Sequence, residues 1–137
     1  MVFSLRVISV MNVAAQALVK DEYSKVGLLG TAFTMEQDFY RGRLSRDFGL
    51  EVVIPNKEDR ELVNDVIFQE LCLGQVLSQS REEYARIAAD MAAQGAQAII
   101  LGCTEIGMLL DQKDAPVPLY DTTVIHAAQA VSYALKG

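Results

Sequence analysis

A single thiol stands where an apolar run ends and a helix is expected to begin. Cys103 follows the run AIILG and precedes Thr104 and Glu105. If the helix begins at Thr104 or Glu105, the thiol lies beside unpaired backbone amides and the positive end of the helix dipole, which stabilise a thiolate and lower its pKa. The same amides can hold a carboxylate. The position predicts a proton-carrying thiol, and the competing interpretation is a buried structural cysteine.

Three other groups of side chains are weaker candidates. Thr31 and Thr34, in the stretch GTAFT, offer hydroxyls and backbone amides after a strand, although threonine also serves there in turns and helix caps. Cys72, in ELCLG, is interpreted as a small core residue. His126 lies among alanines on the last expected helix and is interpreted as a packing residue, since no catalytic partner for it is visible.

These residues must be positioned by regular elements, and the apolar pattern indicates where the elements lie. Short β-branched or continuous apolar runs predict strands at 5–10, 25–30, 50–55 and 98–102. A brief extended piece with two prolines, 115–121, is expected near a sheet edge. The segments between them predict helices at 12–23, 34–49, 56–74, 80–97, 104–112 and 122–137.

The helix ends carry capping signals. We expect Thr34 to cap the helix at 34–49, with Gly49 just past its end. Ser80 and Glu83 have the spacing of a capping box, and Gly95 closes the same helix. The expected buried face of that helix consists of Tyr84, Ile87, Ala88 and Met91.

Strands and helices alternate along the whole chain, which predicts one α/β domain over 1–137. Such alternation is typical of a mainly parallel sheet, here of about four strands, with helices on both faces. Ligands in such folds bind beyond the carboxyl ends of the strands. The loops at 30–34 and 102–105 are therefore the expected site.

Composition excludes several function classes. The 137-residue chain is 51% hydrophobic and carries a net charge of −6 without a basic stripe, which argues against a nucleic-acid partner. Two cysteines and one histidine argue against a metal site. No apolar run has the length of a membrane crossing, and the first residues lack the basic segment of a signal peptide, so we expect a cytoplasmic protein.

Four segments together resemble one known family. They are VGLLGTAFTMEQDFYRGRL, EDRELVNDVIFQELCLG, AAQGAQAIILGCTEIGMLL and PVPLYDTTVIHAAQAV. The chain resembles the aspartate/glutamate racemases, specifically the aspartate racemase branch, from about residue 5 to its end. The most specific element is GCTE after a strand, and the long GT-x-x-TM-x-x-x-FY segment supports it.

The resemblance implies a mechanism and a site. Members of the family have two similar α/β halves around one cleft and use neither pyridoxal phosphate nor a metal. One cysteine removes the α-proton of a small acidic amino acid and a second returns a proton on the opposite face, because inversion passes through a planar carbanion. Cys103 matches the acid/base of the second half. The residues implied to contact the substrate or its loop are Thr104, Thr31, Thr34, Glu105 and Gln75.

Two departures from the family bear on activity. The first-half motif resembling CNT is absent, so the chain resembles a second half, and 1–24 and 121–137 are interpreted as the remains of a linking region. Gln75 stands where relatives often carry a lysine, and an amide cannot neutralise a carboxylate.

The resemblance leaves three hypotheses open. The first is an amino-acid racemase that needs the missing half. The second is an inactive remnant that binds a small carboxylate or a partner protein. The third is a different member of the superfamily, such as a glutamate or hydantoin racemase, and the GCTE ending argues against the glutamate racemase. In each case exposed apolar surface predicts a homo-oligomer, such as a dimer.

Overall fold

The computed structural model describes part of the chain in detail. The described residues are 14–103 and 105–121, without the side chains at 39 and 40. Outside the described residues lie the strand expected at 5–10, the helix expected at 122–137, Thr104 and His126.

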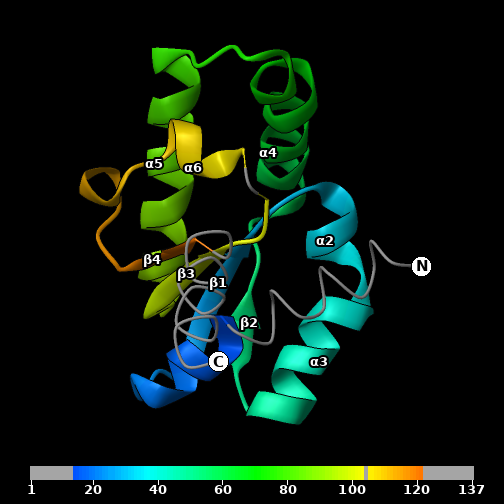
Figure 1. Ribbon diagram of the computed structural model, residues 1–137, viewed down its shortest axis with the longest axis vertical. Helices are drawn as coiled ribbons and strands as arrows, with labels where there is room; N and C mark the ends of the chain where they lie inside the picture. Colours follow the sequence, from blue (N-terminus) through cyan, green and yellow to red (C-terminus); the bar gives the residue numbers. More distant parts are fainter. Residues whose placement is uncertain (1–13, 104, 122–137) are drawn as a thin grey trace, which may run out of the picture.

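The centre of the protein is a sheet of four parallel strands, which confirms the expected α/β class (Figure 1). In the order β2-β1-β3-β4, the strands are Glu51–Val53, Lys25–Leu29, Ala98–Leu101 and Leu119–Asp121. The proline-containing extended piece ends in the edge strand β4, as its composition predicted.

The strand order places a topological switch point beside β1. From β1 the chain moves to β2 on one side and then crosses back to β3 on the other, so β1 pairs with both. A crevice opens at such a point, beyond the carboxyl ends of the strands. The loops that follow β1 and β3 therefore lie together at the edge of the sheet where a ligand is expected.

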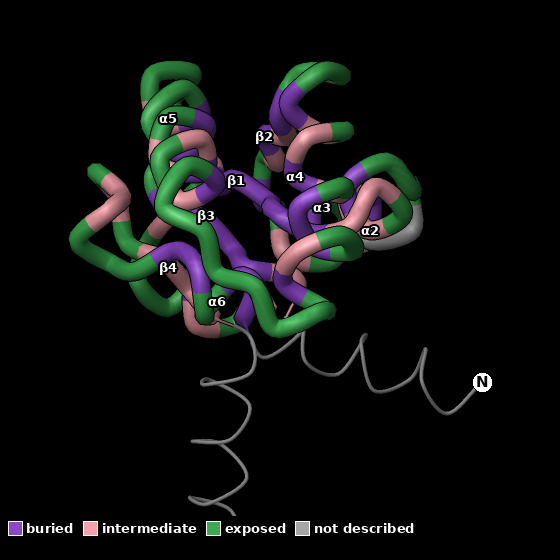
Figure 2. Tube along the Cα trace, turned by 90° about the horizontal axis from the view of Figure 1, so that it is seen from above, coloured by how far each residue is buried: buried purple, intermediate pink, exposed green. Residues whose placement is uncertain are grey.

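Helices cover both faces of the sheet, as expected. Side chains that alternate along β1 enter two separate apolar clusters, since Val26 and Leu28 belong to one and Leu29 to the other. Figure 2 shows β1 and β3 as buried elements at the centre, with exposed helix surfaces around them. The helices are 14–20, α2 (Ala32–Glu36), α3 (Asp38–Phe48), α4 (Lys57–Gln69), η1 (Leu71–Leu73), α5 (Ser78–Ala93), α6 (Ile106–Leu109) and η2 (Gln112–Asp114).

The helix expected at 34–49 is two helices, and its expected cap is wrong. Thr31, not Thr34, is the N-cap of α2, and its side chain accepts a hydrogen bond from the Thr34 amide. Gln37 is extended and separates α2 from α3. A contact with a residue distant in sequence stabilises the start of α2 at Ala32, because the Ala32 amide donates to Asn64 Oδ1 of α4 at 2.8 Å. Sequence pattern alone does not reveal such a contact.

The segment 56–74 also divides, and this overturns the interpretation of Cys72 as a core residue. Glu70 leaves the helical conformation, and the chain continues in the 3-10 turn η1. The turn buries Leu71, whereas Cys72 is exposed. A continuous α-helix was the basis of the prediction, and the change of helix type alters which side chains point inward.

The helix α5 confirms its buried face but not its cap. It begins at Ser78, and its N-cap Leu77 makes no side-chain hydrogen bond. Ser80 lies inside the first turn, where its Oγ donates to the Glu70 carboxylate at 2.5 Å instead of forming a capping box. The four residues predicted for the buried face are all buried.

Candidate active site

The loops after β1 and β3 lie side by side. The Gly102 amide donates to the Leu29 carbonyl at 2.7 Å. A Cβ placed on Gly102 would lie 3.2 Å from that carbonyl and 3.4 Å from Thr34 Cγ2. A side chain at this position would be tightly packed against both, so the glycine before Cys103 favours the close approach of the thiol loop to the threonine loop.

Two hydroxyls are held together on the threonine loop. Thr31 Oγ1 and Thr34 Oγ1 lie 3.2 Å apart, and the Thr34 amide donates to Thr31 Oγ1 at 3.3 Å. Both residues are half-buried. Thr34 also lies against Gly30, at 3.2 Å from the position of an added Cβ. The structure thus brings Thr31, Thr34 and the Cys103 loop to one place.

Cys103 is half-buried and bonded to a carboxylate. Its Sγ donates to Glu105 Oε2 at 2.8 Å, and its carbonyl accepts the Ile106 amide at 3.2 Å. Glu105 is the N-cap residue of α6, in helical rather than extended conformation. Glu105, which was expected to orient this loop, thus contacts the thiol directly.

The acidity of Cys103 is opposite to the prediction. Burial and the hydrogen bond to Glu105 raise the pKa of the thiol from 9.0 to about 12. The predicted lowering needed a helix terminus with free amides. A backbone hydrogen bond from Glu105 does lower the pKa of the thiol, but burial and the Glu105 carboxylate outweigh it, and α6 has only four residues. A buried thiol beside a carboxylate stays protonated.

Three polar residues on α5 and at the end of α4 were not predicted as part of the site. Tyr84 is fully buried, and its hydroxyl donates to the Val63 carbonyl at 2.7 Å. Burial, and to a smaller extent Cys103 and Glu70, raise the pKa of Tyr84. Glu70 is in turn bonded to Ser80. A tyrosine on an otherwise aliphatic helix face was the available signal, because a buried hydroxyl needs a partner.

One of the expected substrate residues makes no described hydrogen bond to the thiol or threonine loops, and another lies outside the described residues. Gln75 is exposed after η1, and its backbone amide donates to the Glu70 carbonyl at 2.8 Å. Thr104 lies outside the described residues. The roles of both stay predictions.

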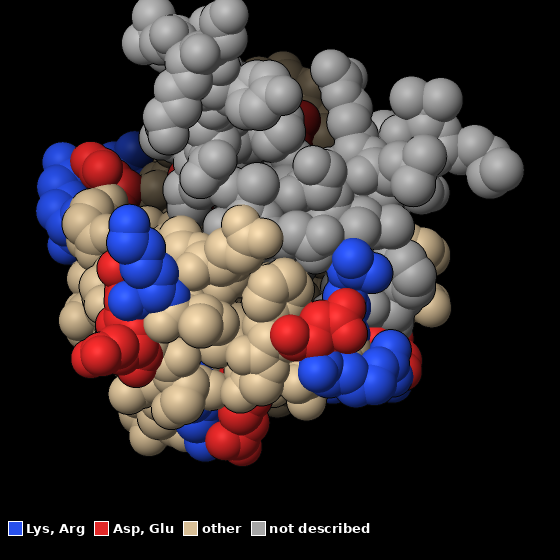
Figure 3. Space-filling model, turned by 60° about the horizontal axis from the view of Figure 1, so that its bottom comes forward, with Lys and Arg blue, Asp and Glu red and all other residues tan. Residues whose placement is uncertain are grey.

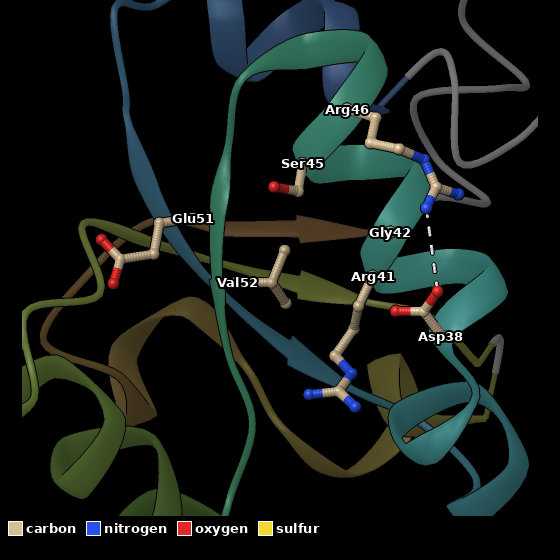
Figure 4. Close-up of a pocket in the computed structure, with 7 residues that line it drawn as sticks. All are labelled: Asp38, Arg41, Gly42, Ser45, Arg46, Glu51 and Val52. Atoms are coloured by element: carbon tan, nitrogen blue, oxygen red, sulfur yellow. Dashed lines mark ion pairs between the residues drawn. The ribbon is translucent and has the colours of Figure 1, made fainter.

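A separate cavity of about 380 Å³ lies between α3 and β2, away from the thiol. Figure 4 shows Arg46 paired with Asp38, at 3.8 Å, while the Arg41 guanidinium points in another direction. Glu51, also on the wall, pairs with Lys25. Basic and acidic side chains likewise lie beside one another on the face shown in Figure 3. The cavity includes no residue of the thiol and threonine loops.

Comparison with known proteins agrees with this arrangement. Residues 2–130 match the family described as Asp/Glu/Hydantoin racemase. The chain belongs to this racemase family. The match includes both loops of the candidate site.

Solved structures of related proteins share the fold. A crystal structure of a candidate Asp/Glu racemase from Yersinia pestis is 49% identical with a TM-score of 0.87, covering 92% of this chain and 55% of that one. An aspartate racemase homologue from Pyrococcus horikoshii OT3 is 36% identical with a TM-score of 0.81, covering 91% and 54%. The racemase-family chain therefore spans about half the length of these structures.

Two matches are less similar in sequence. The Picrophilus torridus aspartate racemase is 23% identical with a TM-score of 0.63, covering 82% of this chain and 46% of that one. An uncharacterized protein from the pnlA 3' region of Pectobacterium carotovorum subsp. carotovorum is 27% identical over 77% of this chain and 69% of its own length.

The described residues also bear on metal sites and on membrane-spanning segments. Within 14–103 and 105–121, no three His, Cys, Asp or Glu side chains are grouped so as to hold a metal ion. No helix in this part of the racemase-family chain has the length and apolar character to cross a membrane.

Proposed function

We propose that the chain supplies one half of an amino-acid racemase of the aspartate type, with Cys103 as one of its two acid/base groups. The observation that carries the proposal is the Sγ–Glu105 hydrogen bond of 2.8 Å at the switch point of a racemase-family sheet. A thiol placed there reaches a substrate in the crevice beyond β1 and β3.

The raised pKa assigns a direction to the proton transfer. At neutral pH the thiol is protonated, since its pKa is about 12. Cys103 therefore begins a turnover as the acid, which gives its proton to one face of a planar carbanion. When it acts as the base instead, Glu105 is positioned to receive the proton that the thiol must first lose.

Substrate binding is assigned to the threonine loop. Thr31 and Thr34 present two hydroxyls and neighbouring amides beside the thiol loop. Hydroxyls and amides bind a carboxylate without neutralising it. We infer a small acidic amino acid as the ligand, held mainly by hydrogen bonds, with Thr104 and Gln75 as further contacts.

The second acid/base must face Cys103 from across the crevice. A surface suited to a facing half exists, since large apolar side chains stay exposed in the elements around the thiol: Phe33 is 62% exposed, Leu73 70% and Met108 51%. Exposed apolar side chains in such numbers favour association. We infer a homo-oligomer, in which a second α/β unit covers the crevice.

The test follows the α-hydrogen of the substrate. Purified chain is incubated with L-aspartate in deuterium oxide, and loss of the Cα–H signal is measured by NMR, together with the appearance of D-aspartate. We expect exchange in the wild-type chain and its loss in Cys103→Ala. Cys72→Ala is the matched control, because it removes a thiol that the mechanism does not use.

Two outcomes count against the proposal. Equal exchange in Cys103→Ala and in the wild-type chain would show that another group moves the proton. No exchange from a folded wild-type chain at any concentration would favour an inactive carboxylate-binding protein. Racemisation itself requires the D-isomer, and we expect it only where a second acid/base completes the crevice.

A further inference from the structure

Hydrogen bonds join one turn of α5 to both η1, which carries Cys72, and α6, which follows Cys103. The Glu70 carboxylate, next to η1, accepts a hydrogen bond from Ser80 Oγ at 2.5 Å. The next residue, Arg81, donates from Nε to the Leu109 carbonyl of α6 at 2.8 Å. Since consecutive residues of α5 hold η1 and α6, these two elements lie in contact with each other.

Backbone hydrogen bonds hold the turn that carries Cys72. The amides of Leu73 and Gln75 donate to the Glu70 carbonyl at 3.1 and 2.8 Å, and the Gly74 amide donates to Leu71 at 3.0 Å. Within this closed turn Leu71 is buried and Cys72 is exposed. The thiol is therefore both accessible to solvent and held in place.

Cys103 lies in the loop that leads into α6, the helix that contacts this turn. It packs against the apolar cluster that contains Leu71 and Ile106. Independently of this packing, Cys72 contributes to the raised pKa of Cys103. The two cysteines therefore belong to neighbouring segments of the fold.

We propose that Cys72 and Cys103 are a redox pair, which closes into an intramolecular disulfide when the chain meets a hydroperoxide. The exposed Cys72 is the thiol that reacts first, because the oxidant reaches it directly. The bond ties the acid/base thiol to η1 and removes it from the crevice.

The chemistry balances in two steps. The Cys72 thiolate attacks a peroxide oxygen and the O–O bond breaks, which gives a sulfenic acid and hydroxide (or an alkoxide, from an organic hydroperoxide). This leaving group takes up the proton that the Cys72 thiol released to solvent when it ionised, and departs as water (or an alcohol). Cys103 then attacks the Cys72 sulfur, so that an S–S bond forms and the S–O bond breaks. The Cys103 proton passes to Glu105, its hydrogen-bond acceptor, and then to the departing hydroxide, which leaves as water.

A regulatory role for the disulfide rests on the proposed function, because the bond inhibits the reaction only if Cys103 is one of its acid/base groups. The bond itself does not depend on that function. Its formation requires Cα atoms within about 7 Å, so oxidation also tests how closely η1 lies to the thiol loop.

The experiment oxidises the full-length chain at low protein concentration with hydrogen peroxide. Free thiols are then alkylated, and the intact mass and a non-reducing peptide map are measured. We expect both thiols to become protected, the mass of the single chain to fall by two hydrogen atoms, and the Cys72 and Cys103 peptides to appear linked until a reductant is added. In Cys72→Ser, Cys103 should stay open to alkylation after the same treatment.

The opposite results would overturn the pairing. These are a disulfide between two chains through Cys72, or oxygenated Cys72 in a single chain whose Cys103 remains free. Substrate exchange in deuterium oxide separates the two proposals. If the linked peptides form but the reduced chain never exchanges the α-hydrogen, the pairing stands and the proposed function fails.

Discussion

The contact between Cys103 and Glu105 predicts how the acidity of the thiol is controlled. Glu105→Gln keeps the size of the side chain and an oxygen acceptor but removes the negative charge that opposes a thiolate. Burial is the largest cause of the raised pKa and persists in the variant. We therefore expect the pKa of Cys103 to fall but to stay above 9.0, the value from which burial and Glu105 together raise it.

The size of the change follows from the geometry. A charged neighbour at hydrogen-bond distance shifts a pKa by about 1–3 units. Cys103 is half-exposed, and solvent screening places the shift near the lower end. A fall of about one unit gives about ten times more thiolate at any pH well below the pKa.

The assay is the rate of alkylation by iodoacetamide across an alkaline pH series. Cys72→Ser is the background for all measurements, so that Cys103 is the one thiol that reacts. Glu61→Gln, which removes an exposed carboxylate from α4, is the matched control and should leave the rate unchanged. An alkylation profile for Glu105→Gln that matches the background, or one shifted to higher pH, would refute the reasoning.

Further predictions concern stability and assembly. An alanine Cβ at Gly27 would overlap the Met91 side chain. Gly27→Ala should therefore lower the free energy of unfolding in urea by about 1–3 kcal/mol, with the flexible thioether moving to relieve part of the overlap. An unchanged midpoint of the urea transition would contradict this packing. Gly49 has φ 67 and no atom within 4 Å of an added Cβ, so Gly49→Ala should cost about 1–2 kcal/mol through backbone strain alone. Leu73→Glu places a charge on the exposed apolar surface and should lower the molar mass measured by light scattering. A wild-type chain that is monomeric in the same measurement would contradict the inferred oligomer.

The class of fold was readable from local pattern. Continuous apolar runs mark β1 and β3, because a strand buried on both faces needs apolar residues at every position. Alternation with helical segments then predicts a parallel sheet. That sheet places the ends of β1 and β3 at one edge, and so Thr31, Thr34 and Cys103 were expected together before any coordinate was known.

The tertiary structure decided the details on which the chemistry depends. The start of α2 rests on Asn64, and the position of Ser80 rests on Glu70, partners that are distant along the chain. The outward direction of Cys72 follows from the end of α4 at Gln69. Local propensity does not contain such contacts.

The acidity of the thiol shows the difference most directly. The residue types after β3 placed Cys103 at the carboxyl edge of the sheet, where local pattern indicated a helix terminus. Its pKa depends on how much solvent the packed cluster excludes and on the direction in which the Glu105 carboxylate points. Sequence therefore indicated that the threonine and thiol loops meet at one edge of the sheet. Only the folded packing determined the proton affinity of the sulfur, because desolvation is a property of all the neighbours together.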